Sequence, residues 1–234
     1  MHSSTRSTDK VNIETWEQSL VAEVEGSYAH NSRLYSALEA SARGEEIHRF
    51  YSFDAHQPPF FKFLQLWLPK AEGLVKDALL KHIEEEVSEE HSRLFQDMMK
   101  VLAIEYPISQ TMADVPQLRE LNYVFSEACA REQSLGYFCG CFFATEMMSA
   151  KRCAQTLKGL RRIGFPETAL RYLIIHAEAD TSHAELAMRD FIRPFVTTQT
   201  DQIAARAEVE KGLRDRLRRS ENFIRWYETQ FEQT

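Results

Sequence analysis

The stretch His176-Ala-Glu-Ala-Asp180-Thr-Ser-His183 lies inside a run from Pro166 to Ile192 that has the pattern of one helix, ended by Pro194. At 3.6 residues per turn, offsets of four and seven place His176, Asp180 and His183 on one stripe of that helix. Two imidazoles and a carboxylate on one stripe are typical of half of a divalent-metal site. The simpler interpretation is that they are polar groups on the exposed surface of an amphipathic helix. Apolar neighbours beside the stripe favour the metal: Leu173, Ala177, Ala184 and Ala187.

A second candidate ligand is Glu146, in the almost wholly apolar run LGYFCGCFFATEMM that extends from Leu135 to Met148. Residues 117–162 have helical periodicity, with a bend expected near Ser134. A carboxylate buried in such a helix is costly unless it is protonated, paired or bound to a metal. Lys151 and Arg152 are the nearest cations along the helix, but they lie off the face of Glu146.

The third candidate group lies in the acidic run His82-Ile-Glu84-Glu-Glu-Val-Ser-Glu-Glu-His91, within residues 71–104. This region is predicted to be one long helix or two abutting helices, and most of its carboxylates are expected on a solvated face. Glu84 and His91 are seven residues apart and share one face of a continuous helix, which Val87 and Leu94 suggest is turned inward. Titratable groups directed at a core need a partner, and a cation would supply it.

The three regions together offer three carboxylates and three imidazoles, enough for two metal ions with bridging carboxylates. The six candidate ligands are Glu84, His91, Glu146, His176, Asp180 and His183. Ligation that is rich in oxygen, includes imidazole and lacks thiolate fits iron or manganese better than structural zinc. The spacing differs from that of ferritin-like bundles, which supply two Glu-x-x-His pairs and two further glutamates.

The composition of the chain narrows its class. With 234 residues and 44% hydrophobic content, it fits one large domain, and a net charge of -7 argues against nucleic acid or an anionic membrane as the main partner. Neither a membrane-spanning apolar run nor the hydrophobic centre of a signal peptide is found, so we expect a cytoplasmic protein. The cysteines lack C-x-x-C spacing and are expected to be reduced and buried: Cys129, Cys139, Cys141 and Cys153.

The periodicity predicts an all-α fold, because no strand pattern, internal repeat or low-complexity tract is present. Residues 1–10 are polar and are expected to form a disordered tail, and residues 11–234 to form a single helical domain. The first helix is expected to be capped by Asn12 or Thr15. The last is expected over residues 199–231. Leu74 and Ile203 are expected on the inner faces of their helices.

The ordered pattern of the six candidate ligands resembles that of the heme-oxygenase-like diiron oxidases and oxygenases. That family has a Glu with a His seven residues later, a Glu inside an apolar helix, and then His-x3-Asp-x2-His. The resemblance covers residues 71–192 in register and the whole chain in length and helical layout, and it implies a single bundle of about seven helices. It further implies that His91 and His176 hold one iron, that Asp180 and His183 hold the other, and that Glu84 and Glu146 are shared or bridging.

By this resemblance we expect an enzyme with two Fe(II) ions, or manganese as the alternative metal, and O2 as co-substrate. The implied reaction is N-oxygenation, cleavage or decarboxylation of a small molecule derived from an amino acid or a carboxylic acid. One branch of the family consumes a tyrosine of its own; Tyr35 matches that tyrosine only loosely, and Thr156 stands where the branch has a lysine.

Other readings of the chain stay open. It could be a non-catalytic helical binding or regulatory protein, or a thiaminase-like or cofactorless member of the same fold. A homodimer is compatible with long exposed helices. Three aromatic residues lie one turn from candidate ligands and are expected to form the apolar wall of a substrate pocket, although core packing is the simpler role for each: Phe142, Phe143 and Tyr172.

Overall fold

The computed structural model describes residues 12–40, 43–53, 60–88, 91–109 and 115–231, in which helices are joined by turns and short connections and no strand is found. The α-helices are α1 (Ile13–Gly26), α2 (Arg33–Ala40), α3 (Gly44–Tyr51), α4 (Phe60–Gln65), α5 (Gly73–Ser88), α6 (His91–Glu105), α7 (Pro116–Asn122), α8 (Glu127–Glu132), α9 (Leu135–Arg162), α10 (Arg171–Leu186), α11 (Arg193–Thr198) and α12 (Gln202–Phe231). Short 3₁₀ segments cover Leu68–Lys70, Tyr123–Phe125 and Glu167–Ala169, and a π-helical segment covers Ala187–Ile192. The all-α prediction is confirmed.

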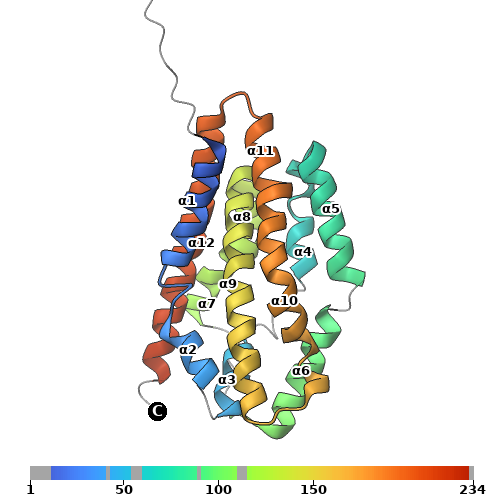
Figure 1. Ribbon diagram of the computed structural model, residues 1–234, viewed down its shortest axis with the longest axis vertical. Coiled ribbons are helices and arrows are strands. Elements are labelled where there is room, and N and C mark those ends of the chain that lie inside the picture. Colours follow the sequence, from blue (N-terminus) through green and yellow to red (C-terminus); the bar gives the residue numbers. More distant parts are fainter. Residues whose placement is uncertain (1–11, 41–42, 54–59, 89–90, 110–114, 232–234) are drawn as a thin grey trace, which may run out of the picture.

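Helix α9 is the centre of the bundle, and the other long helices are arranged around it (Figure 1). It packs along α12 on one side and along α10 on the other. Helix α1 lies against α12, while α4 and α5 lie beyond α10 (Figure 1). The two helices expected to carry Glu146 and His176 are therefore neighbours along much of their length.

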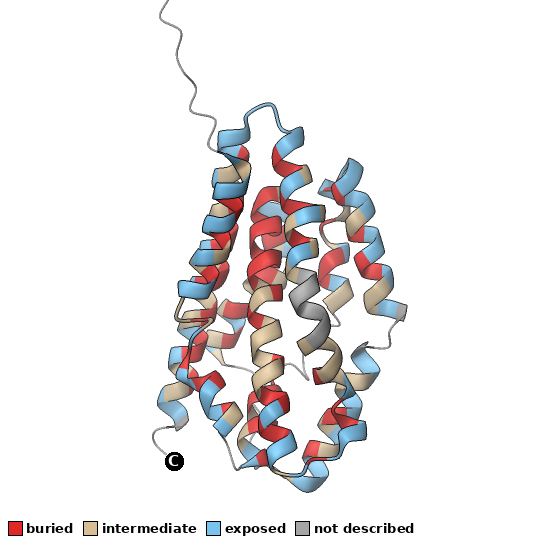
Figure 2. Ribbon diagram, viewed as in Figure 1, coloured by how far each residue is buried: buried red, intermediate tan, exposed pale blue. Residues whose placement is uncertain are grey.

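The sequence explains why α9 is both long and central. Its first half is apolar, and the Ser134 hydroxyl caps it by accepting a hydrogen bond from the Tyr137 backbone N–H at 3.2 Å. All residues from Gly136 to Ala144 are buried, which Figure 2 shows as the continuous buried stretch of this helix. A helix that is apolar all round is stable in water only when other helices cover every face.

Two glycines allow α9 and α12 to approach backbone to backbone. A Cβ at Gly140 would lie 1.9 Å from the Val209 carbonyl oxygen, and a Cβ at Gly212 would lie 1.9 Å from the Tyr137 carbonyl oxygen. Neither oxygen is at the end of a flexible side chain, so neither can move aside cheaply. The crossing of these helices therefore requires glycine on both of them.

Aromatic rings fill the core on another side of α9. Phe138 stacks on Trp67 with ring centroids 4.9 Å apart, and Phe142 contacts Phe191 of the π-helical segment at 4.9 Å. Phe142 also contacts the ring of His82 from α5 edge-on at 5.2 Å. The face of α9 that carries Phe142 is thus covered by α5 and the π-helical segment.

The region predicted as one long helix or two abutting helices is two. Helix α5 ends at Ser88 and α6 begins at His91, with residues 89 and 90 outside the described part of the chain. The seven-residue spacing of Glu84 and His91 therefore does not place them on one face of a single helix. Val87 is 55% exposed and Leu74 is 67% exposed, so the inward side of α5 differs from the one expected.

The expected single helix from Pro166 to Ile192 begins later and does not end at Pro194. It starts at Arg171, widens into the π-helical segment at Ala187, and passes into α11 at Arg193. The Arg193 backbone N–H bonds to the Met188 carbonyl, five residues back, and Pro194 then takes a first-turn position where no N–H donor is needed. The chain thus remains helical through the proline.

Further differences concern number and boundaries. More helices are found than the seven expected, because short segments between the long ones are helical too. The Asn12 cap is confirmed, since its side chain accepts from the Glu14 N–H at 3.0 Å. Ile203 is 80% exposed instead of inward-facing. The expected tail, residues 1–10, lies outside the described residues, and within them no helix combines the length and hydropathy that crossing a bilayer needs.

Candidate metal centre

Glu146 is buried, with 5% of its surface exposed. It lies four residues after Phe142 and three after Phe143, which are 1% and 2% exposed. Side chains at these offsets share a stripe of the helix, so Glu146 belongs to the side of α9 that α5 and the π-helical segment cover. The prediction of a carboxylate inside the apolar part of α9 is confirmed.

His176 lies on α10 and is half-buried. Its Nδ1 atom is 2.7 Å from the backbone carbonyl oxygen of Tyr172, one turn earlier. A carbonyl oxygen can only accept, so Nδ1 carries the hydrogen and the lone pair of the neutral ring is on Nε2. This second contact fixes the tautomer and the orientation in which an imidazole can bind a metal.

Tyr172 lies between His176 and helix α6. Its ring centroid is 4.1 Å from that of His176 and 5.0 Å from that of Phe95. The ring therefore holds the imidazole from one side and links α10 to α6. A role in a substrate pocket remains a proposal for Tyr172, as it does for Phe142 and Phe143.

The inward-facing residues of α5 are not those expected from the spacing of Glu84. Glu84 is exposed, whereas the side chains of His82 and Glu86 are 8% and 11% exposed. His82 Nε2 lies 3.9 Å from Glu86 Oε1, and His82 Nδ1 lies 3.8 Å from Glu85 Oε2. The sequence does contain the signal for this face, because Val75, Leu79, His82 and Glu86 recur at helical spacing.

Three of the six candidate ligands cannot be placed by side chain. His91 begins α6, and Asp180 and His183 belong to α10, but the structure describes no side chain at these positions. Among the side chains that it does describe, no group of three or more His, Cys, Asp or Glu could hold a metal ion. The structure thus brings the helices of Glu146 and His176 together, while the complete ligand set stays a prediction.

The structure also places Tyr35 and Thr156, the two positions compared with the branch that consumes its own tyrosine. Tyr35 is buried at 5% exposure, and the Thr156 hydroxyl lies 3.2 Å from the hydroxyl of another residue, Tyr51. Thr156 is fully buried and in a polar contact, so the lysine position of that branch is taken by a structural hydroxyl.

All four cysteines are buried and free, as predicted. Burial raises the pKa of Cys129 to about 11 and also raises the pKa of the Cys139 and Cys141 thiols. Because a thiolate is the reactive form of cysteine, these three thiols are protonated and unreactive near neutral pH.

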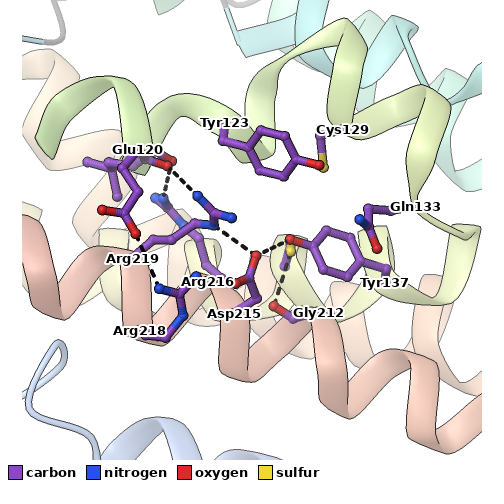
Figure 3. A network of polar contacts seen from close by, with 12 residues as sticks. Glu120, Tyr123, Cys129, Gln133, Tyr137, Gly212, Asp215, Arg216, Arg218 and Arg219 are labelled. Carbon is purple, nitrogen blue, oxygen red and sulfur yellow. Dashed lines mark hydrogen bonds and ion pairs between the residues drawn. The ribbon is translucent and has the colours of Figure 1, made fainter. Parts of the chain in front are cut away.

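A polar network that the sequence did not reveal lies where α9, α12 and α7 meet (Figure 3). The buried Tyr137 hydroxyl donates to Asp215, which also accepts from Arg219 Nε and Arg218 Nη2, each at 2.8 Å. Although burial alone would raise the pKa of Asp215, the hydrogen bonds from Arg219, Tyr137 and Arg218 lower it. This network connects α9, α12 and α7, and it contains none of the six candidate ligands.

The donor types available near Glu146 and His176 fit iron. A buried carboxylate on α9, and an imidazole on α10 with its Nε2 lone pair oriented, are the oxygen and nitrogen donors that non-haem iron takes. A bound cation would also offset the cost of burying the Glu146 charge. The residues present therefore agree with an iron site.

The fold and these central helices define an all-α bundle with a buried carboxylate beside a helix that carries imidazole groups. The chain belongs to a family of iron-containing redox enzymes, whose family model matches residues 40–217. This confirms the resemblance at the level of family and fold. No curated protein matches the chain.

The chain is also similar to a solved structure, a CadD-like protein of unknown function from Nostoc punctiforme. The two chains share 18% sequence identity with a TM-score of 0.64, over 91% of this chain and 93% of the other. At this identity the similarity establishes the shared fold alone.

Proposed function

We propose that the chain is a non-haem diiron oxidase or oxygenase that uses O2 to oxidise a small substrate derived from an amino acid or a carboxylic acid. The observation that carries this proposal is Glu146, a carboxylate 5% exposed in the apolar half of α9, next to the helix of His176. Membership of an iron-containing redox family supports it.

The two iron ions would be held by Glu84 on α5, His91 on α6, Glu146 on α9, and the α10 residues His176, Asp180 and His183. When bound, the ions supply the electrons and the open coordination positions that activation of O2 requires. The three carboxylates of this set, Glu84, Glu146 and Asp180, would offset most of the positive charge of two Fe(II) ions.

The chain's own side chains prepare such a site in two ways. Tyr172 orients the His176 imidazole through its carbonyl oxygen and its ring. Phe142 and Phe143 keep bulk water from the α9 stripe that ends in Glu146, because both are almost fully buried. We propose that these three aromatic residues also form the apolar wall against which the substrate lies.

The competing functions are less well supported. A thiaminase-like reaction needs a cysteine thiolate, whereas burial keeps the thiols of Cys129, Cys139 and Cys141 protonated. In a purely structural helical protein, an apolar residue at position 146 would pack without the cost of burying a charge.

Anaerobic loading with Fe(II) followed by metal analysis tests the proposal. We expect the wild-type chain to hold about two iron ions and to give an optical transient on mixing with O2. Glu146→Ala is expected to lose iron and the transient while its helical circular dichroism persists. The matched control is Glu105→Ala, which removes an exposed carboxylate from α6. Wild-type iron content in Glu146→Ala would refute the assignment of this ligand.

A further inference from the structure

The connection between α1 and α2, residues 27–32, is held against α9 by Lys151. The Nζ atom of this lysine donates to the Asn31 side-chain oxygen at 2.8 Å, and it lies 3.4 Å from His30 Nδ1. Asn31 and Lys151 are 120 residues apart in the sequence. The lysine therefore joins two distant segments of the bundle.

The connection is a compact turn. The Asn31 backbone N–H donates to the Ser27 and Tyr28 carbonyl oxygens, each at 3.1 Å. The His30 N–H donates to the Ser27 hydroxyl at 3.2 Å. Ala29 is fully buried, while His30 is half-buried. Because these bonds tie the turn together, a displacement of His30 from α9 would carry Asn31 with it and open the core at Ala29.

The contact with Lys151 requires a neutral His30 ring. An ammonium group has hydrogen-bond donors only, so Nδ1 must present its lone pair and the ring hydrogen must be on Nε2. A protonated imidazole has no lone pair and carries a positive charge. Protonation of His30 would therefore turn this contact into a repulsion between like charges.

The charged groups that act on His30 come from α9 and α1. Burial is the main reason that the pKa of His30 is lowered, and the ammonium of Lys151 on α9 lowers it further. Glu25 of α1 and the hydrogen bond with Asn31 raise the pKa, but they do not reverse the shift. The attached connection therefore resists protonation of its histidine.

Other contacts hold the flanks of the connection without His30. The Tyr28 hydroxyl donates to Glu228 of α12, and the Arg225 guanidinium carbon lies 3.7 Å from the centre of the Tyr28 ring. Helix α2 approaches α9 backbone to backbone, since a Cβ at Gly159 would lie 2.1 Å from the Leu38 carbonyl oxygen. Loss of the Lys151 contact would thus be a local event.

We propose that His30, Asn31 and Lys151 form an acid-sensitive latch, which holds the α1–α2 connection on α9 at neutral pH and releases it in mild acid. The released connection binds a proton more readily, because water then surrounds His30 and Lys151 is distant. Release is favoured as the pH falls below about 6.5, the pKa of an exposed histidine, and the effect is largest below the lowered pKa of the attached state. The latch does not depend on iron.

Methyl NMR of the alanine-labelled full chain, with a soluble paramagnetic agent, tests the release. We expect the relaxation enhancement of the Ala29 methyl signal to rise at least about threefold between about pH 7.5 and about pH 5. The methyl signal of Ala144, fully buried on α9, should not change. It is the internal reference for loosening of the whole bundle.

Two substitutions separate the latch from a general effect of acid. His30→Asn supplies a neutral side chain whose oxygen can still accept from Lys151, so Ala29 should stay covered at both pH values. Lys151→Met should uncover Ala29 at both pH values and raise the pKa of His30, measured from its ring signals, because one cause of the lowering is removed. The matched control is Lys158→Met, which removes an exposed lysine of the same helix.

The proposal is overturned if the Ala29 signal of the wild type does not depend on pH, or if Ala144 responds to the same extent. It is also overturned if His30→Asn keeps the acid response, or if Lys158→Met uncovers Ala29 as Lys151→Met does. If Lys151→Met fails to fold, the wild type and His30→Asn decide the matter.

Discussion

At the scale of single residues, a few polar side chains of the predicted site are buried or half-buried among apolar groups. Glu146 is such a group on α9, and His176 has its tautomer set by the Tyr172 carbonyl. On α5 the inward groups are His82 and Glu86, whereas Glu84, the predicted ligand, is exposed. Which carboxylate of α5 serves iron is therefore a question that two substitutions can decide.

We predict that Glu84→Gln weakens Fe(II) binding at least about tenfold, because it removes a charged ligand but keeps the shape of the side chain. Glu86→Gln should leave the binding of both ions close to that of the wild type. Iron content after dialysis against graded chelator concentrations measures the difference. The opposite result, with iron lost only in Glu86→Gln, would transfer the ligand role to the inward face of α5.

At the scale of helices, the position of α9 depends on small residues as much as on large ones. Gly140 and Gly212 allow backbone contact with α12, while Phe138 and Phe142 fill the wider space on another side. Helix α9 is thereby held against α12, which also sets where its Glu146 stripe points. The crossing of α9 and α12 thus supports the site without contributing a ligand.

We predict that Gly140→Ala destabilises the fold by about 1–3 kcal/mol, because the added methyl group meets the Val209 carbonyl. This cost outweighs the gain of about 1 kcal/mol that alanine brings to a helix. Gly26→Ala is the matched control, since nothing lies within 4 Å of a Cβ there. Urea unfolding measures both variants. If Gly140→Ala had the same free energy of unfolding as the wild type, α9 and α12 could move apart without loss of stability, and the prediction would be wrong.

At the scale of the whole molecule, hydrogen bonds and ion pairs between helices hold the bundle together in addition to its hydrophobic core. The network of Tyr137, Asp215, Arg218 and Arg219 joins α9 to α12, and Arg219 Nη1 reaches the Glu120 carbonyl on α7 at 3.0 Å. Figure 3 shows the Tyr137 and Arg219 side chains meeting at Asp215, with Arg218 beside Glu120. Asp215 thus links α9 to α12 directly, and it holds the Arg219 side chain that reaches α7.

The stability of the fold should depend on pH through Asp215. Its pKa in the folded state is lowered, because hydrogen bonds from Arg219 and its neighbours outweigh the effect of burial. Its stabilising contribution is therefore present above the unfolded-state value of about 3.9 and is lost as pH falls through the lower folded-state pKa. Asp215→Asn should lose about 1–3 kcal/mol at pH 7 and show a shallower loss toward acid.

Thermal unfolding between pH 7 and pH 3 measures this dependence. Asp97→Asn is the control, because it removes an aspartate whose ion pair with Lys100 is largely exposed. A pH profile of Asp215→Asn parallel to that of the wild type would mean that other carboxylates carry the acid sensitivity.

The all-α class and the apolar helix around Glu146 follow from the sequence alone, because both depend on local periodicity and composition. The same holds for the Asn12 cap and the burial of the cysteines, which need no knowledge of distant contacts. The pattern of six candidate ligands likewise indicated the family of iron-containing redox enzymes, since motif spacing is a property of the chain.

Only the tertiary structure decided which faces are buried and where helices end. The sequence of α5 offers two competing apolar faces, one through Val75 and Leu79 and one through Val87, and only the structure shows that His82 and Glu86 face inward instead of Glu84. The Asp215 network joins residues of three helices, α7, α9 and α12. Such groupings arise from packing between segments far apart in the sequence, and packing is a property of the folded molecule.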